Sequence, residues 1–236
     1  MDIKNRNFWG YYDNGIYRVG CTGGSVYVYN QENQKLARFQ DMRYVYAGVF
    51  MPNTNIFVAK STEGILAVYD LDRLELVKKI VITRIGAQDE GFAFSPDGKY
   101  FYNIEKPKSS LRTQLTKYDT SDFHVAETLF AGRKELFLCE IEFEQTTENG
   151  YILGYMRDDK DLCKYNFVAQ FIEDEIVNIK RLAEEVFWYA LAYKGWERSG
   201  FTKKAFASSS GLVNWKEKGA VSLRELFEKA CDLEGE

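Results

Sequence analysis

The chain has 236 residues, of which 45% are hydrophobic and 28% charged, so it is long enough and apolar enough to bury a core of its own. Its formal net charge of −4 argues against a nucleic-acid partner, because such proteins neutralise phosphates with an excess of Lys and Arg. No run approaches the roughly 18 apolar residues of a membrane span, which argues against a membrane protein.

The cysteines and the single histidine give no sign of a disulfide framework or a metal site. The cysteines are isolated in the sequence, without a CxxC pair, and His124 alone cannot build a His-rich site. The first residues lack the apolar stretch of a signal peptide. We therefore expect a cytoplasmic protein with reduced cysteines, no cofactor and no metal. The four cysteines are Cys21, Cys139, Cys163 and Cys231.

A short motif recurs through the chain: an apolar run that ends in an aromatic residue followed by Asn or Asp. The marker aromatics lie about 40–50 residues apart, which is the period of propeller blades. The last copy is degenerate, because Lys216 follows its aromatic residue. The five markers are Tyr29, Tyr69, Tyr118, Tyr165 and Trp215.

Each of the first four markers follows a predicted hairpin. In the third repeat, Gly91–Phe94 and Lys99–Ile104 flank the turn Ser95–Gly98, where Pro and Gly hold the second and fourth positions favoured in a type I turn. In the first repeat, Asp13–Gly15 joins two apolar strands, and an Asn-Gly turn requires positive φ at both residues. A polar turn and a fourth strand follow each marker, as at Leu74–Ile80. Four meandering strands per repeat predict propeller blades.

Two of these motifs resemble those of WD-repeat proteins. Phe94–Gly98 reads Phe-Ser-Pro-Asp-Gly, and Val68–Asp70 reads Val-Tyr-Asp. The resemblance implies an all-β fold, a small β-propeller of about five four-stranded blades in a single domain. The Gly-His and Trp-Asp pairs of a full WD motif are missing, so no specific family is assigned. The predicted repeats cover approximately residues 6–40, 44–82, 90–131, 136–182 and 186–221.

The C-terminal part departs from the repeat. Val186–Tyr193 reads as the first strand of the fifth repeat or as a short helix, with the strand slightly favoured. Residues 222–232 predict an amphipathic helix packed on the propeller, because Ser222 and Glu225 form a capping-box pattern and an apolar stripe follows. The alternative is a helix that binds a partner.

The sequence offers little catalytic chemistry. It has no GxGxxG, P-loop, GxSxG or HExxH motif, and His124 falls in a predicted outer strand. Five-bladed propellers include glycosidases, which need two carboxyl groups about 5–10 Å apart. Glu90 and the alternating Glu140, Glu142 and Glu144 are the candidates, and alternation places the last three on one face of a strand. We expect a non-catalytic protein, with a glycoside hydrolase as an alternative.

One predicted rim gathers charged and aromatic residues. It is formed by the loops between second and third strands together with the connections between repeats, and loops on a rigid scaffold often carry function. The insertion at Glu105–Ser110 lies there too, and Tyr44, Trp188 and Trp196 are candidate anchors. The candidate partner-binding residues are Arg43, Tyr44, Arg84, Asp89, Arg133, Lys134, Arg157, Asp158, Asp159 and Asp161.

The sequence therefore predicts an interaction module that binds a protein partner through this rim, without nucleic acid or membrane. This prediction rests partly on how such folds are commonly used. A sharper alternative is an immunity protein that neutralises a basic bacterial toxin, for which the acidic loop at Asp158–Asp161 would bind the toxin.

Overall fold

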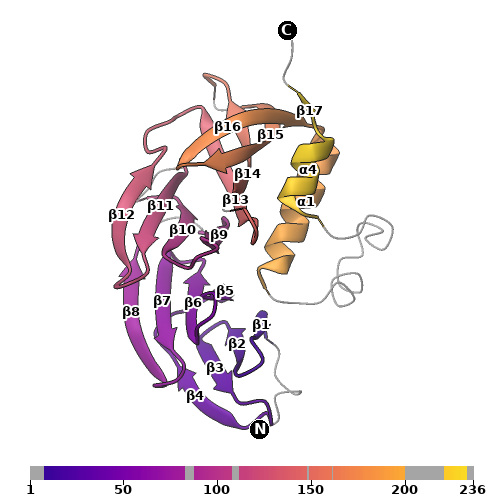
Figure 1. Ribbon diagram of the computed structural model, residues 1–236. Coiled ribbons are helices and arrows are strands. Elements are labelled where there is room, and N and C mark those ends of the chain that lie inside the picture. Colours follow the sequence, from indigo (N-terminus) through magenta and orange to yellow (C-terminus); the bar gives the residue numbers. More distant parts are fainter. Residues whose placement is uncertain are drawn as a thin grey trace. The chain divides into compact units, whose positions relative to one another are not determined.

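The computed structural model describes residues 8–82, 88–107, 112–147, 149–160, 162–199 and 221–232. The chain divides into two compact units. The first unit consists of Met1–Asp89 and Trp196–Lys218, and the second of Glu90–Gly195 and Gly219–Glu236. Each unit is built on antiparallel sheets in which consecutive strands pair (Figure 1).

The first unit contains two four-stranded meanders, which we call sheets A and B. Sheet A has the order β1-β2-β3-β4, and sheet B the order β5-β6-β7-β8. The strands of sheet A are β1 (Gly10–Asp13), β2 (Arg18–Thr22), β3 (Ser25–Tyr29) and β4 (Lys35–Phe39). Those of sheet B are β5 (Val45–Phe50), β6 (Ile56–Ser61), β7 (Ile65–Asp70) and β8 (Glu75–Val81).

The second unit contains sheets C and D. Sheet C pairs its strands in the order β12-β11-β10-β9, and sheet D in the order β13-β14-β15-β16-β17. The strands of sheet C are β9 (Phe92–Phe94), β10 (Tyr100–Glu105), β11 (Gln114–Asp119) and β12 (His124–Leu129). Those of sheet D are β13 (Leu136–Phe143), β14 (Gly150–Arg157), β15 (Cys163–Ile172), β16 (Glu175–Leu182) and the short β17 (Cys231–Asp232).

The central strands are apolar on both faces, so each sheet must pack on a neighbour. All five residues of β3 are buried, as are the first five of β7. Sheets A and B share a core that includes Val28 and Phe57, and sheets C and D share one that includes Leu115 and Phe167. Burying one such side chain contributes about 1.5–3 kcal/mol. The described residues thus confirm the predicted all-β fold of repeated four-stranded meanders.

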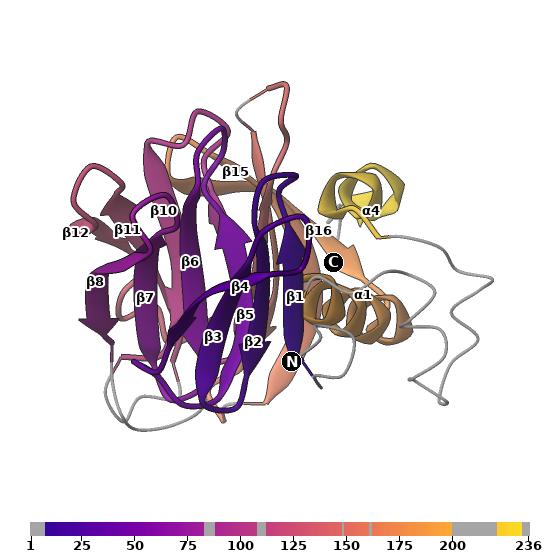
Figure 2. The ribbon, with the colours of Figure 1, turned by 90° about the horizontal axis from the view of Figure 1, so that it is seen from below.

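Two helices cover the face of sheet D that points away from sheet C (Figures 1 and 2). They are α1 (Glu184–Glu197) and α4 (Leu223–Lys229). On β14, Tyr155 contacts Phe187 of α1 and Tyr151 contacts Phe227 of α4, with ring centroids 6.2 Å and 5.7 Å apart. Residues four apart on a strand share a face, so both helices pack on the same side.

The favoured strand at Val186–Tyr193 is therefore wrong, because this segment lies within α1. Its buried residues Phe187, Ala190 and Tyr193 recur every three positions, which suits one face of a helix rather than an alternating strand. Residues 200–220, the rest of the predicted fifth repeat, lie outside the described residues.

The C-terminal helix is confirmed, but it is shorter than predicted. It ends at Lys229, and Cys231–Asp232 pair with β16 as β17. Ser222 occupies the N-cap position without a side-chain cap hydrogen bond, so the capping box predicted with Glu225 does not form there.

The recurring marker has a physical explanation. Tyr29, Tyr69 and Tyr118 lie at or next to the end of the third strand of their sheets and are almost completely buried. The polar residue that follows each one closes the next turn: Asp70 Oδ1 accepts hydrogen bonds from the N–H groups of residues 72 and 73, and Asp119 Oδ1 accepts from residue 121. Such Asx turns favour Asn and Asp at this position.

The fourth marker does not fit this pattern. Tyr165 and Asn166 lie near the beginning of β15, and the strand continues to Ile172. The following turn is made by Glu173 and Asp174, both with positive φ. The fourth marker thus has the spacing of the repeat, but it does not occupy the same structural position as the first three markers.

The two turns emphasised in the sequence behave differently. In Ser95–Gly98 the Gly98 N–H donates to the Ser95 carbonyl at 2.9 Å and Gly98 has a φ of 73°, as its place in the turn requires. In Asp13–Gly15 only Gly15 has positive φ, so the expected positive φ at Asn14 is wrong. Asn14 Oδ1 instead accepts hydrogen bonds from the N–H groups of residues 16 and 17, which makes a longer turn.

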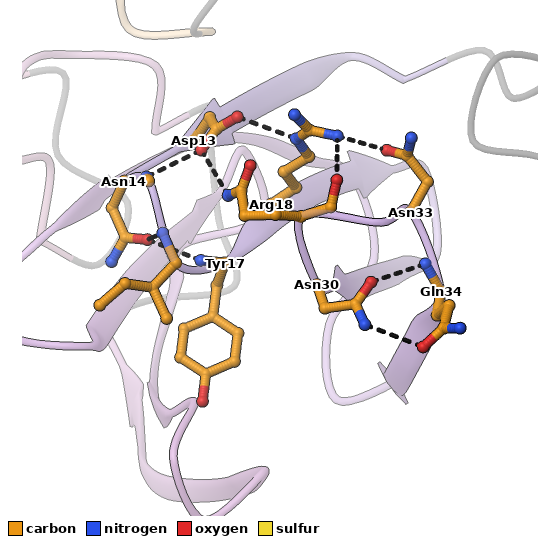
Figure 3. A network of polar contacts seen from close by, with 10 residues as sticks. Asp13, Asn14, Tyr17, Arg18, Asn30, Asn33 and Gln34 are labelled. Carbon is orange, nitrogen blue, oxygen red and sulfur yellow. Dashed lines mark hydrogen bonds and ion pairs between the residues drawn. The ribbon is translucent and has the colours of Figure 1, made fainter.

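This turn belongs to a polar network at one end of sheet A (Figure 3). Arg18 Nε bonds Asp13 at 2.9 Å, and Arg18 Nη1 bonds the Gln31 carbonyl at 3.0 Å and Asn33 Oδ1 at 2.7 Å. Asn30 and Gln34 add two further hydrogen bonds across the β3–β4 turn. The network ties the β1–β2 turn to the β3–β4 turn.

The Asp13 carboxyl predicts a specific dependence of stability on pH. Burial acts to raise its pKa, but hydrogen bonds from Arg18, the Gly15 N–H and Gln31 outweigh burial and hold the pKa below its ordinary value. Its stabilising contribution is complete above the unfolded pKa of about 3.9 and is lost as the pH falls through the lower folded value. Asp13→Asn should therefore reduce the loss of stability between pH 5 and pH 2, measured by urea unfolding. If the free energy of unfolding fell equally between pH 5 and pH 2 in the variant and the unchanged protein, this role would be contradicted.

Candidate functional site

Tyr44 is held on the predicted rim by backbone hydrogen bonds to turns of two sheets. Its N–H donates to the Gly23 carbonyl at 2.7 Å, in the β2–β3 turn, and its carbonyl accepts from Thr62 N–H at 3.1 Å, in the β6–β7 turn. The Ser61 hydroxyl donates to the carbonyl of Arg43 next to it. Tyr44 has a φ of 52°, a left-handed conformation that is unfavourable for a bulky side chain and persists where the surroundings impose it.

The Tyr44 side chain lies in solvent beside a second large aromatic residue. Tyr44 is 49% exposed and Trp9 is 45% exposed, and their rings are stacked with centroids 6.4 Å apart at 18°. The backbone N–H of Trp9 donates a hydrogen bond to the Cys21 carbonyl at 2.8 Å, which fixes the backbone at this residue. With the exposed Arg43, these residues form what we call the Trp9–Tyr44 patch. The sequence prediction included Arg43 and Tyr44 but missed Trp9.

The Arg157 guanidinium stacks with two aromatic rings at the end of sheet D where β14 meets β15. Its guanidinium carbon is 4.5 Å from the Phe137 ring centroid, and Phe137 stacks on Tyr155 at 4.6 Å and 14°. Arg157 Nη2 also donates to the Tyr155 hydroxyl at 2.9 Å. Burial raises the pKa of Tyr155, against the opposing effect of Arg157, so this hydroxyl stays protonated. The stack fixes the guanidinium in one orientation.

The second unit also exposes two large apolar side chains. Leu162 is 62% exposed and Trp188 is 54% exposed. Trp188 Nε1 donates to Glu184 at 3.3 Å, and the N–H of Asp158, next to Arg157, donates to the Leu162 carbonyl at 2.9 Å. Trp188, a predicted anchor, is thus an exposed aromatic residue.

The other predicted rim residues make mainly local contacts. Arg133 pairs with Glu135 at 2.9 Å, and the Lys134 carbonyl accepts from Arg112. Asp158 Oδ1 accepts from the N–H groups of residues 160 and 162, which makes it a turn residue. Asp89 and Asp159 are exposed. Arg84 and Asp161 lie outside the described residues, as do positions 108–110 of the predicted insertion.

Two of the alternating glutamates, Glu142 in β13 and Glu144 just after it, hold the helices on sheet D. Glu142 Oε2 pairs with Lys194 of α1 at 2.8 Å and accepts the N–H of Leu223, the first residue of α4, at 3.0 Å. Glu144 pairs with Arg224 of α4. Glu140 is 2% exposed. These contacts give Glu142 and Glu144 a structural role at the helix–sheet interface.

Glu142→Gln should accordingly destabilise the second unit. The change removes a negative charge from beside the Lys194 ammonium, whose side chain is only 9% exposed, and charge-assisted hydrogen bonds contribute about 1.5–3 kcal/mol. We expect a loss of about that size in the free energy of unfolding by urea. Glu185→Gln, an exposed position in the first turn of α1, is the control and should stay within about 0.5 kcal/mol of the unchanged protein. Equal effects would contradict the role of Glu142.

A cavity at the other end of the second unit was not predicted. It is lined by 13 residues, including Tyr100, Tyr102, Lys117, Phe171 and Asp174. These side chains come from the hairpin-turn ends of sheets C and D, opposite the predicted rim. The alternating aromatics Tyr100 and Tyr102 were visible in the sequence, but nothing in it indicated that Asp174 would lie beside them.

Two features are absent from the described part of the chain. None of its helices combines the length and apolar character needed to cross a bilayer. In the same part of the chain, no group of three or more His, Cys, Asp or Glu side chains could hold a metal ion.

Comparison with solved structures shows a likeness to propeller proteins. Hydrazine synthase of Kuenenia stuttgartiensis matches with a TM-score of 0.57 and 17% identity, over 72% of this chain and 52% of that one. The WD40 domain of Toxoplasma gondii coronin matches with a TM-score of 0.53 and 14% identity, over 73% of this chain and 44% of that one. The chain thus spans about half the length of these proteins. At this identity the likeness shows the fold alone, which is all-β and propeller-like.

Comparison of sequences adds no family. No family model and no curated protein matches the chain.

Proposed function

We propose that the chain is a non-catalytic binding module that docks a protein partner on the rim carrying the Trp9–Tyr44 patch. The observation that carries the proposal is this stacked, half-exposed aromatic pair at the junction of two sheets. Trp, Tyr and Arg dominate the residues that contribute most to binding at protein interfaces, and the patch contains all three. The likeness to a WD40 domain agrees with a role in protein interaction at the level of the fold.

The backbone at Tyr44 gives the patch a further property. A left-handed φ in a residue other than glycine costs of order 1 kcal/mol or more, and it persists only when neighbouring contacts enforce it. At Tyr44 the hydrogen bonds to Gly23 and Thr62 enforce it. The ring is therefore positioned before a partner arrives, so less ordering entropy is lost on binding.

We propose that Arg157, Leu162 and Trp188 form a second candidate binding surface, which belongs to the second unit by itself. Stacking on Phe137 orients the Arg157 guanidinium, and Leu162 and Trp188 offer exposed apolar area. A fixed guanidinium can form paired hydrogen bonds with a carboxylate of the partner. Two of the four glutamates considered for a glycosidase, Glu142 and Glu144, instead hold helices, which supports a structural role for this pair.

The test is affinity capture from the native cells, with tagged protein in three forms. The unchanged chain should retain one partner in a stoichiometric amount, and the double variant Trp9→Ala/Tyr44→Ala should retain at least tenfold less, since removing interface hot spots costs about 2 kcal/mol or more. Ile16→Ala, an exposed apolar residue at the other end of sheet A, should bind like the unchanged chain.

Equal recovery of the partner by all three forms would contradict the proposal, provided that thermal unfolding shows the variants to be folded. A retained partner that is a basic toxin would assign the chain to immunity. Turnover of chromogenic glycosides by the unchanged chain would replace binding by catalysis.

A further inference from the structure

The second unit has a cavity of about 380 Å³, partly open to solvent, among its hairpin turns. Three turns surround it: Ser95–Asp97 before β10, Thr147 and Asn149 before β14, and Glu173–Asp174 between β15 and β16. Four aromatic side chains line it, which are those of Tyr100, Tyr102, Phe143 and Phe171. The volume lies in the range of about 300–1,000 Å³ typical of small-ligand sites. The cavity can therefore receive a group of side-chain size or a little larger.

One wall of the cavity already holds a cation of the protein itself. The Lys117 ammonium lies 4.2 Å from the ring centroid of Tyr100 and 5.7 Å from that of Tyr102, and it pairs with Asp174 Oδ2. Asp174 Oδ1 accepts the Tyr102 hydroxyl at 2.9 Å. Burial, and then the hydrogen bond to Asp174, raise the pKa of Tyr102 well above its ordinary value, so the hydroxyl remains a donor. Ring faces with a carboxylate are the groups that recognise organic cations.

The charges of the lining residues are unbalanced. Asp97, Glu173 and Asp174 are acidic, whereas Lys117 is the basic residue among them and is engaged by Asp174. The Ser95 hydroxyl bonds Asp97 at 2.7 Å and, with the N–H and the ammonium of Lys99, lowers the pKa of its carboxyl. Asp97 Oδ2 pairs with Lys99 Nζ at 3.1 Å, so Glu173 is the acidic lining residue left over after these two ion pairs. An anion entering the cavity would meet the charge of Glu173, whereas a cation would meet this carboxylate together with the aromatic rings.

We propose that this cavity binds an organic cation, a guanidinium or alkylammonium group, between the aromatic rings and the carboxylates of Asp97, Glu173 and Asp174. The cation would come either from a free small molecule or from a basic side chain of a polypeptide. All the lining residues belong to the second unit and none of them is part of the Trp9–Tyr44 patch, so this inference does not depend on the function proposed for that patch.

Backbone NMR of the full chain can test both sources. The probes are agmatine for the free cation and a triarginine peptide for side chains, with N-acetylglutamine amide as a neutral control. Both cations should shift the amide signals of residues 97, 173 and 174 in a saturable way, and the neutral compound should not. If only one of the two probes gives saturable shifts, that probe shows whether the cation is a free small molecule or a basic side chain. Equal shifts with the neutral compound, or shifts that do not saturate, would overturn the proposal.

Substitutions at the site should change the affinity for the cation in opposite directions, depending on the charge that they remove. Glu173→Gln removes one exposed carboxylate and should weaken binding of the cation about two- to fivefold, as expected for a partly solvated charge pair. Lys117→Met removes the resident ammonium and leaves the rings and Asp174, so it should strengthen binding about fivefold or more. Glu185→Gln, on an exposed position of α1 that does not line the cavity, should leave the affinity unchanged.

The Lys117 variant also separates this proposal from its opposite. If the cavity bound anions, inorganic phosphate would shift the same signals and Lys117→Met would abolish the effect. That result would contradict the inference. Thermal unfolding of each variant shows whether the site is still folded, and Glu173→Gln changes a side chain in an exposed turn, so it keeps the test decisive if Lys117→Met does not fold.

Discussion

The structure depends on a constraint that every one of its sheets shares: a four-stranded meander with two apolar faces cannot bury both of them alone. Sheets A and B cover one another in the first unit, and sheets C and D do so in the second. Sheet D has its second face covered by α1 and α4. Two glutamates serve this cover, because Glu142 and Glu144 hold the helices by charge-assisted contacts. Repeat proteins commonly end on a capping element of this kind.

Packing of neighbouring sheets also produces the surfaces proposed to function. Where the turns of sheets A and B meet, they share the backbone of Tyr44 and turn its ring toward solvent beside Trp9. Where the hairpin turns of sheets C and D meet, they bring Asp174 to Tyr102 and Lys117. Both sites join residues from different sheets, so each exists only when its pair of sheets is assembled.

The sequence predicted the parts of the fold that depend on local chemistry. Buried aromatics followed by Asn or Asp marked the third strands of sheets A, B and C, because Asx turns need those residues. The fourth marker failed because Tyr165–Asn166 copies the motif inside a longer strand. The apolar run before Tyr193 did not distinguish a strand from a helix. Its helical spacing of Phe187, Ala190 and Tyr193 becomes evident only because these three side chains are the ones buried when α1 packs on sheet D. Trp9 and the cavity were missed because contacts across sheets leave no local pattern.

The central claim, that a protein partner docks on the rim carrying the Trp9–Tyr44 patch, is tested most directly by amide hydrogen exchange of the chain alone and bound to its captured partner. The account predicts slower exchange on binding in residues 22–24 and 40–44, where the turns of sheets A and B hold Tyr44, with no change in the turns at residues 14–17 and 30–34. Slower exchange confined to those opposite turns, with the rim unchanged, would contradict it.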